Sequence, residues 1–153
     1  MHYRALKITY LEDVKIKVTY QDGTIVKFDI STLFSKYPQF KILQENRELF
    51  MMGRLDPGGY GISWNDELDL DATSIYFDGE IIGKAETSLN QKIGFLLAKT
   101  REEQHITQSE LAKISKIDQG DISKIEKGVG NPTLSKISKL FNSLGKVLDL
   151  TVL

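Results

Sequence analysis

The spacing of apolar residues changes along the chain, from alternating near the N-terminus to helical in the last third. Val14, Ile16 and Val18 alternate with lysine and threonine, which is the period of a strand with one buried face. Asp22-Gly23 then indicates a hairpin turn, because both residues tolerate a positive φ. Three strands are predicted, over residues 5–10, 14–20 and 24–30.

Shorter elements follow these strands. A helix is predicted over residues 32–37, capped by Ser31 and ended by Pro38, and another over residues 46–52. An Asp-Pro-Gly-Gly turn at residues 56–59 precedes a strand at residues 60–64, and the acidic residues 65–73 are predicted to be irregular. Periodicity fades after Asp78, so a domain linker is predicted at residues 81–88.

Helical spacing begins after this linker. A helix over residues 89–102, capped by Thr87 or Ser88, has its apolar face at Ile93, Leu96, Leu97 and Thr100. Another, over residues 134–144, can be capped by Thr133 and ended by Gly145. Residues 147–153 alternate again and predict a strand. A second copy of the chain, or the edge of the N-terminal sheet, would be its partner.

Two short helical patterns with a tight break between them occupy residues 106–128. Thr107 and Glu110 have the spacing of a capping box at the start of the first pattern. Asp118 can cap the second pattern, and Gly128 ends it. Their apolar faces contain Leu111, Ala112, Ile114, Ile122 and Ile125. This arrangement is typical of a helix-turn-helix.

The residues around this motif resemble the phage-repressor-like (Xre/Cro-type) helix-turn-helix domains. The matching residues are Arg101, Thr107-Gln108, Leu111-Ala112, residues 122–128 and Pro132-Thr133-Leu134. This resemblance covers about the last 60 residues and implies an all-α, lambda-repressor-like domain. Residues 14–76 resemble a small bacterial α+β domain of unknown function, through the strand ending FDIS and the segment WNDELDLDATSIY.

The helix-turn-helix resemblance also implies which residues contact DNA. They are Gln108, Gln119, Gly120, Asp121, Ser123, Lys124, Lys127 and Asn131. A glutamine such as Gln119 can bond adenine, and Lys124 can reach guanine or phosphate. Gln108 would bind a phosphate at a helix N-terminus. Arg101 and Glu126 would form a structural ion pair.

Three features of the motif favour an alternative. Gly120 has no side chain with which to read bases, and Asp118 and Asp121 bring negative charge towards a polyanion. Lys116 occupies the turn where the family prefers glycine, and a positive φ there costs about 1 kcal/mol. The alternative is an antitoxin-like protein-interaction module with weak or no DNA binding.

Charge follows the same division of the chain. Residues 1–86 contain 10 basic and 14 acidic residues, for a net charge of −4, and residues 87–153 contain 10 and 7, for +3. The basic excess thus lies on the half with the DNA-binding motif. No apolar run approaches the length of a membrane span, and the charged N-terminus is unlike a signal peptide. The 153-residue chain has no cysteine, so a cytoplasmic protein without a membrane partner is expected.

No metal or catalytic site is expected. The acidic residues Asp66, Glu67, Asp69 and Asp71 lack the glycine and the final glutamate of an EF-hand, so they predict a charged surface loop. The two histidines are isolated, and no nucleophile motif is present. The chain is therefore expected to be neither an enzyme nor a cofactor-binding protein.

Together these patterns predict an α+β fold. Residues 1–80 would form a small antiparallel sheet with short helices, and residues 89–153 a helix-turn-helix domain with a C-terminal strand. The expected function is sequence-specific binding of double-stranded DNA by a transcriptional regulator, a homodimeric repressor. The resemblance implies a toxin protein as a further partner.

Overall fold

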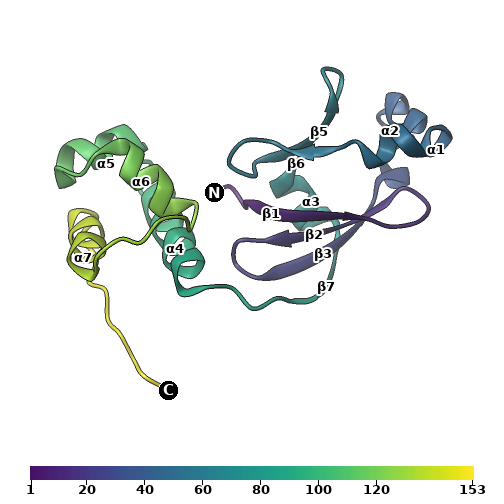
Figure 1. Cartoon of the computed structure of the whole chain (residues 1–153). Coiled ribbons are helices and arrows are strands. Elements are labelled where there is room, and N and C mark those ends of the chain that lie inside the picture. Colours follow the sequence, from purple (N-terminus) through teal and green to yellow (C-terminus); the bar gives the residue numbers. More distant parts are fainter. The chain divides into compact units, whose positions relative to one another are not determined.

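The alternating segments near the N-terminus form a four-stranded antiparallel sheet (Figure 1). Its strands are β1 (Ala5–Tyr10), β2 (Lys15–Tyr20), β3 (Thr24–Asp29) and β7 (Glu80–Lys84), in the order β1-β2-β3-β7. Ile16 lies opposite Phe28 and Val18 opposite Val26, and all four side chains are buried. The three predicted strands and their buried face are confirmed.

The structure is a computed structural model that describes residues 1–153. It divides between Glu86 and Thr87 into two units, called here the N-terminal and the C-terminal domain. The linker predicted at residues 81–88 is wrong in its first half, because β7 pairs with the outer edge of β3, with Lys27 opposite Glu80 and Thr24 opposite Lys84. Ile81 and Ile82 are exposed, so β7 lacks the alternation that would have identified it.

A second antiparallel sheet consists of β4 (Arg54–Leu55), β5 (Gly61–Asn65) and β6 (Leu68–Asp71), with β5 in the centre. The irregular segment predicted at residues 65–73 is therefore wrong. Leu68 is buried and Leu70 half-buried, whereas Asp69 and Asp71 are exposed. This is the alternation of a strand with one face in the core, and aspartates occupy the other face.

The helices of the N-terminal domain are short. They are the 3-10 helices η1 (Ile30–Leu33) and η2 (Pro38–Lys41), and the α-helices α1 (Ile42–Glu45), α2 (Arg47–Met51) and α3 (Ala72–Asp78). The helix predicted over residues 32–37 is wrong: η1 is capped by Asp29, not Ser31. Pro38 begins η2 because the first turn of a helix needs no N–H from that residue. The helix predicted at residues 46–52 is confirmed as α2, with Asn46 as its cap.

Aromatic side chains complete the N-terminal core. Trp64 is buried, and its indole Nε1 donates to the Phe50 carbonyl at 2.7 Å. The Tyr20 hydroxyl donates to the Ala72 carbonyl at 2.7 Å, and burial raises the pKa of this phenol. These two hydrogen bonds satisfy polar atoms in an otherwise apolar core.

Four helices form the C-terminal domain: α4 (Leu89–Glu103), α5 (Gln108–Ser115), α6 (Gln119–Glu126) and α7 (Leu134–Ser143) (Figure 1). Each begins at a side chain that accepts a backbone N–H, from Ser88, Thr107, Asp118 and Thr133 respectively. All four caps are residues predicted from the sequence. The helices share one apolar core that includes Leu97, Leu111, Ile122 and Leu140.

Two predicted core positions are wrong. Leu96 is 47% exposed and Ile114 is 55% exposed. The buried face of α4 instead contains Gly94, Ala98 and Arg101, and Ser115 is buried at the end of α5. The face of α4 is rotated from the predicted one because glycine and alanine allow close helix packing, which an apolar pattern does not reveal.

The C-terminal strand predicted over residues 147–153 is absent from the single chain. Val147 and Val152 are almost fully exposed, and only Leu148 packs against the helical core. Neither sheet includes this segment, so the predicted pairing with the N-terminal sheet is also absent. A strand requires a hydrogen-bonded partner, and the alternating residues have none here.

Candidate nucleic-acid interface

A tight turn sets the geometry of the helix-turn-helix. Lys116, which ends α5, has a left-handed backbone conformation, with φ 60° and ψ 27°. The buried Ser115 accepts the Ile117 N–H on its hydroxyl at 3.3 Å, and Ile117 is itself buried. The turn therefore lies against the core on both sides of an exposed, strained lysine.

Replacing Lys116 by glycine should stabilise the C-terminal domain by about 0.5–1 kcal/mol, because glycine adopts a positive φ without the steric cost that lysine has. The gain is limited by the larger entropy of glycine in the unfolded chain. Urea denaturation monitored by circular dichroism measures this difference. Lys113→Gly, in the middle of α5, is the matched control and should destabilise by about 1 kcal/mol. Equal effects of both substitutions would refute strain at Lys116.

The capping box at the start of α5 has the predicted contacts. The Thr107 hydroxyl accepts the Glu110 N–H at 3.1 Å. The Thr107 N–H and hydroxyl donate to the Glu110 carboxylate at 2.7 and 2.8 Å, and these hydrogen bonds lower the pKa of Glu110. Gln108 is thereby fixed at the first position of the helix.

A buried carboxylate connects three helices. Glu126 is fully buried, and the Arg101 guanidinium donates to both of its oxygens, at 2.6 and 2.9 Å. The Gln108 side-chain amide donates to the same carboxylate at 2.8 Å. Arg101 also donates to the Ile106 carbonyl at 2.8 Å. Arg101 and Glu126 thus form the expected ion pair, which joins α4 and α6, while Gln108 adds the start of α5.

The packing of α4 against α6 depends on Gly94. A Cβ atom at this position would overlap the Ile125 carbonyl oxygen and would lie 2.9 Å from that of Glu126. The α6 backbone therefore rests directly on α4. Together with the Glu126 network, this contact fixes the orientation of α6.

The outward side of α6 carries most of the predicted DNA-contacting residues. We call this surface the recognition face and define it by Gln119, Gly120, Ser123, Lys124 and Lys127. Ser123 is half-buried, and the other four residues are exposed. A Cβ at Gly120 would meet only the Asp118 carboxylate, so this position is open on the surface. The recognition face is thus polar, accessible and free of backbone obstruction.

Asp121 has a partner that the sequence did not indicate. Its carboxylate accepts from the Lys136 ammonium of α7 at 2.8 Å, and this hydrogen bond lowers the pKa of Asp121. A spacing of 15 residues, across a loop, gives no sequence signal for such a pair. The negative charge of Asp121 is therefore matched by a lysine beside the recognition face.

Replacing Lys136 by methionine should raise the pKa of Asp121 towards its ordinary value, because the pair's hydrogen bond is lost. A depressed folded-state pKa means that the pair stabilises the fold at neutral pH. That contribution disappears as the pH falls through the folded-state pKa, below the usual aspartate range. A carbon-detected NMR titration of Asp121 measures the shift. Lys139→Met makes an equal charge change on α7 and should leave the pKa of Asp121 unchanged. If the pKa of Asp121 is also unchanged in Lys136→Met, the two side chains do not form a pair.

Of the remaining predicted contacts, Asp121 and Asn131 lie together beside α6. Lys124, Asn131 and Lys136 line a shallow cavity of about 140 Å³ together with Asp121. The Asn90 side chain of α4 donates to the Gly130 carbonyl at 3.0 Å and so anchors the loop that carries Asn131. Gln108 lies elsewhere, against Glu126. Nothing in the sequence pattern identified Asn90 as a support of this loop.

The chain contains no cluster of three metal-binding side chains. None of its helices combines the length and the apolar character required to cross a membrane.

Comparisons with known proteins agree with the two-part division of the chain. Residues 97–149 match a family described as helix-turn-helix, and residues 5–80 match a family described as a protein of unknown function (DUF2442). A solved structure named "Putative DNA Binding Protein", from Nitrosomonas europaea, aligns over 92% of this chain and 85% of its own, with 12% identity and a TM-score of 0.43. No curated protein matched. The chain thus combines a domain that matches DUF2442 with a following domain that matches the helix-turn-helix family.

Proposed function

We propose that this protein is a transcriptional regulator that binds a specific sequence of double-stranded DNA through the recognition face. The observation that supports this proposal most directly is the fixed orientation of α6. Glu126 and Gly94 hold its inner side against α4, while Gln119, Lys124 and Lys127 remain exposed. A rigid helix with a free polar side is what major-groove recognition requires.

Each residue would have a distinct role. Gln119 would make a bidentate contact with adenine, and Lys124 would bond guanine or a neighbouring phosphate. Lys127 and Asn131 would bind phosphates and position the helix. The backbone N–H groups at the start of α5, beside Gln108, would bind a phosphate, while the side-chain amide of Gln108 keeps its hydrogen bond to Glu126.

The pair between Asp121 and Lys136 supports binding despite the acidic residues of α6. A free carboxylate beside the groove would repel DNA phosphates, whereas a carboxylate paired with an ammonium has little net charge. In the Lys136→Met variant, DNA affinity should therefore fall, and adding Asp121→Asn should restore part of it.

The regulator would act as a homodimeric repressor. Two copies would place their α6 helices in successive major grooves, about 34–36 Å apart. The exposed apolar side chains of Val147, Leu150 and Val152 are available for contact between copies. A repressor of this kind covers its operator, and a toxin protein would be a separate partner of the assembly.

Selection of bound sites from a pool of random DNA sequences tests this function. Enriched sequences should contain two inverted half-sites with centres about 10 base pairs apart, and sedimentation should find two chains on each site. A reporter promoter carrying the selected site should lose expression when the protein is present. Recovery of random sequences without enrichment would favour the alternative, a protein-interaction module.

A further inference from the structure

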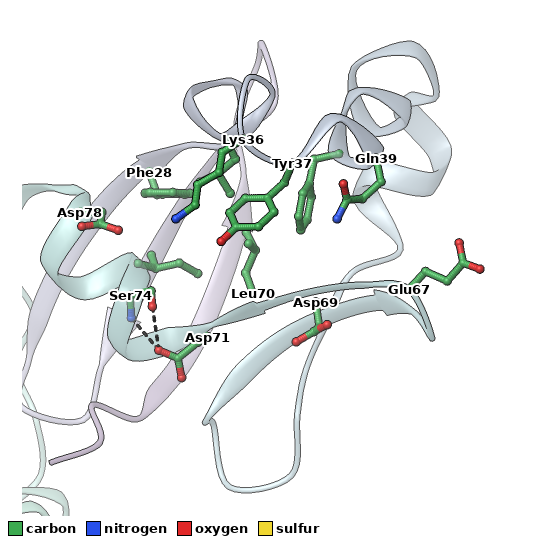
Figure 2. A pocket seen from close by; sticks show the side chains of 13 residues that line it. Phe28, Lys36, Tyr37, Gln39, Glu67, Asp69, Leu70, Asp71, Ser74 and Asp78 are labelled. Carbon is green, nitrogen blue, oxygen red and sulfur yellow. Dashed lines mark hydrogen bonds between the residues drawn. The ribbon is translucent and has the colours of Figure 1, made fainter.

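The N-terminal domain contains a groove that the DNA-binding function does not use. Its volume is about 530 Å³, and it lies between the segment from η1 to η2 and the segment formed by β6 and α3 (Figure 2). Phe28, Leu70 and Ile75 contribute apolar lining. We call it the acidic groove. A cavity of this size with an apolar floor is typical of a binding site.

The two walls of the acidic groove differ in chemistry. Leu33, Tyr37 and Phe40 line the first wall, and Tyr37 is 39% exposed. Figure 2 shows the side chains of Lys36 and Tyr37 extending from this wall towards the other. The Lys36 ammonium lies 5.2 Å from the centre of the Tyr37 ring. This wall is therefore mainly aromatic and aliphatic, with a single positive charge.

Carboxylates line the second wall, which contains Glu67, Asp69, Asp71 and Asp78. Asp71 caps α3, and its carboxylate accepts the Ser74 N–H at 2.7 Å. Glu67, Asp69 and Asp78 form no ion pair in the structure. The lining thus contains four carboxylates and one lysine, so the groove has a negative charge that a ligand can match.

The spacing of these carboxylates fits an extended chain. Glu67, Asp69 and Asp71 are alternate residues at and before β6, and alternate residues in a strand are about 7 Å apart. In addition, β6 is an edge strand that pairs only with β5. An extended segment lying beside β6 would repeat with the same spacing, and its successive side chains would point to opposite walls.

We propose that the acidic groove binds an extended segment of a partner protein in which lysine or arginine alternates with apolar residues. The basic side chains would face Glu67, Asp69 and Asp78, and the apolar ones would contact Tyr37 and Leu33. This inference is independent of DNA binding, because it concerns another surface of the chain and another ligand.

Other occupants match the acidic groove less well. Nucleic acid is polyanionic and would be repelled by the carboxylates. A second copy would bring its own acidic β6 to the edge, and acidic edge strands oppose such pairing. A small organic cation could pair with one carboxylate, but it is too short to pair with several carboxylates along β6.

The first experiment measures binding of two synthetic peptides to the full-length protein by isothermal titration calorimetry. One peptide alternates arginine and leucine, and the other has the same composition with all arginines before all leucines. The alternating peptide should bind at least about tenfold more tightly, and its affinity should fall as salt screens the charges. Equal binding of both peptides, or binding of neither, would overturn the proposal.

Variants of the acidic groove locate the binding. A triple variant removes three carboxylates of the groove: Glu67→Gln, Asp69→Asn and Asp78→Asn. Its affinity for the alternating peptide should be at least about tenfold lower, because three opposite charges are lost. Tyr37→Ala should weaken it several-fold through lost apolar contact. The matched control removes the same charge elsewhere in the domain, with Glu12→Gln, Glu45→Gln and Glu48→Gln combined, and should change affinity less than about twofold. Equal losses in both triple variants would show diffuse attraction rather than a site.

Two further measurements separate the other occupants. Agmatine, a small organic cation, is titrated in the same way. If agmatine binds and the triple variant weakens that binding, while the alternating peptide does not bind, the site takes a small cation and the assignment of a partner segment is wrong. If the triple variant changes the sedimenting mass of the protein alone, a second copy occupies the groove and the assignment is again wrong. The expected result is an unchanged mass and no measurable agmatine binding.

Discussion

Replacing Glu126 by alanine is expected to destabilise the C-terminal domain by about 3–5 kcal/mol, because the buried Arg101 guanidinium would lose the carboxylate that it bonds at both oxygens and would keep only Glu102, at 3.6 Å, as an acidic neighbour. Both hydrogen bonds from Arg101 to the carboxylate would be lost, together with the one from Gln108. Arg101 is only 7% exposed, so water cannot replace these partners without rearrangement of the helices. The loss should be among the largest for a single substitution in this domain.

Denaturation in urea with two signals measures this effect separately in each domain. Trp64 is the only tryptophan and lies in the N-terminal core, so its fluorescence reports on that domain. Helical circular dichroism reports mainly on the C-terminal domain. Glu103→Gln, an exposed position on α4, is the control and should change stability by less than about 0.5 kcal/mol.

A double variant distinguishes an unpaired charge from lost packing. Replacing Arg101 by methionine and Glu126 by leucine removes both charges, so it should recover much of the stability that Glu126→Ala loses. If the double variant is as unstable as the sum of the single variants, the two side chains do not act as a pair.

Substitution of Gly94 by valine is expected to destabilise the same domain by about 3 kcal/mol or more, because overpacking would separate α4 from α6. The obstacle is the backbone of Ile125 and Glu126, which cannot move aside as a flexible side chain can. The orientation of α6 should change as well, so specific DNA binding should be lost even under conditions where the variant remains folded.

A second glycine in the same domain provides the control. Gly120 lies in the first turn of α6, where the one close neighbour of an added Cβ would be the Asp118 carboxylate oxygen, at 2.9 Å. This side chain can shift, so Gly120→Ala should change stability by less than about 1 kcal/mol. Urea midpoints and heteronuclear NMR spectra of both variants test the comparison. A Gly94→Val protein with normal stability and an unchanged spectrum would show that the two helices are not in close backbone contact.

The helix-turn-helix could be predicted from sequence because its signals are local. Thr107 and Glu110 are three residues apart, and Asp118 lies directly before the helix that it caps. Cap residues act on N–H groups within one turn, so the sequence alone contains the interaction. The ion pair of Arg101 with Glu126 spans 25 residues, and only the family resemblance indicated it.

Elements that depend on distant partners could not be predicted. Strand β7 exists because the edge of β3 is available, and its exposed Ile81 and Ile82 have no alternation. Strand β6 did carry an alternating signal, Leu68-Asp69-Leu70-Asp71, but its aspartates suggested a loop. The segment at residues 147–153 has the opposite property: its pattern is that of a strand, and the single chain offers no partner.

The same distinction applies to the candidate DNA-binding surface. Gln119, Lys124 and Lys127 lie on the exposed side of α6, as helical periodicity predicts. The pairing of Asp121 with Lys136 depends on how α6 packs beside α7, so periodicity within one helix cannot reveal it. This pair changes the expected role of Asp121 from a repulsive charge to a neutralised one.

Titration of the selected DNA site with recognition-face variants tests the central claim most directly. Gln119→Ala should weaken binding to that site by about 1–3 kcal/mol, with little change on unrelated DNA. Lys124→Glu should weaken it by more, because a contact is replaced by repulsion. Lys41→Glu, an equal charge reversal on the N-terminal domain, is the control. If all three variants bind with the same affinity as the unaltered protein, α6 does not contact DNA and the recognition face has another role.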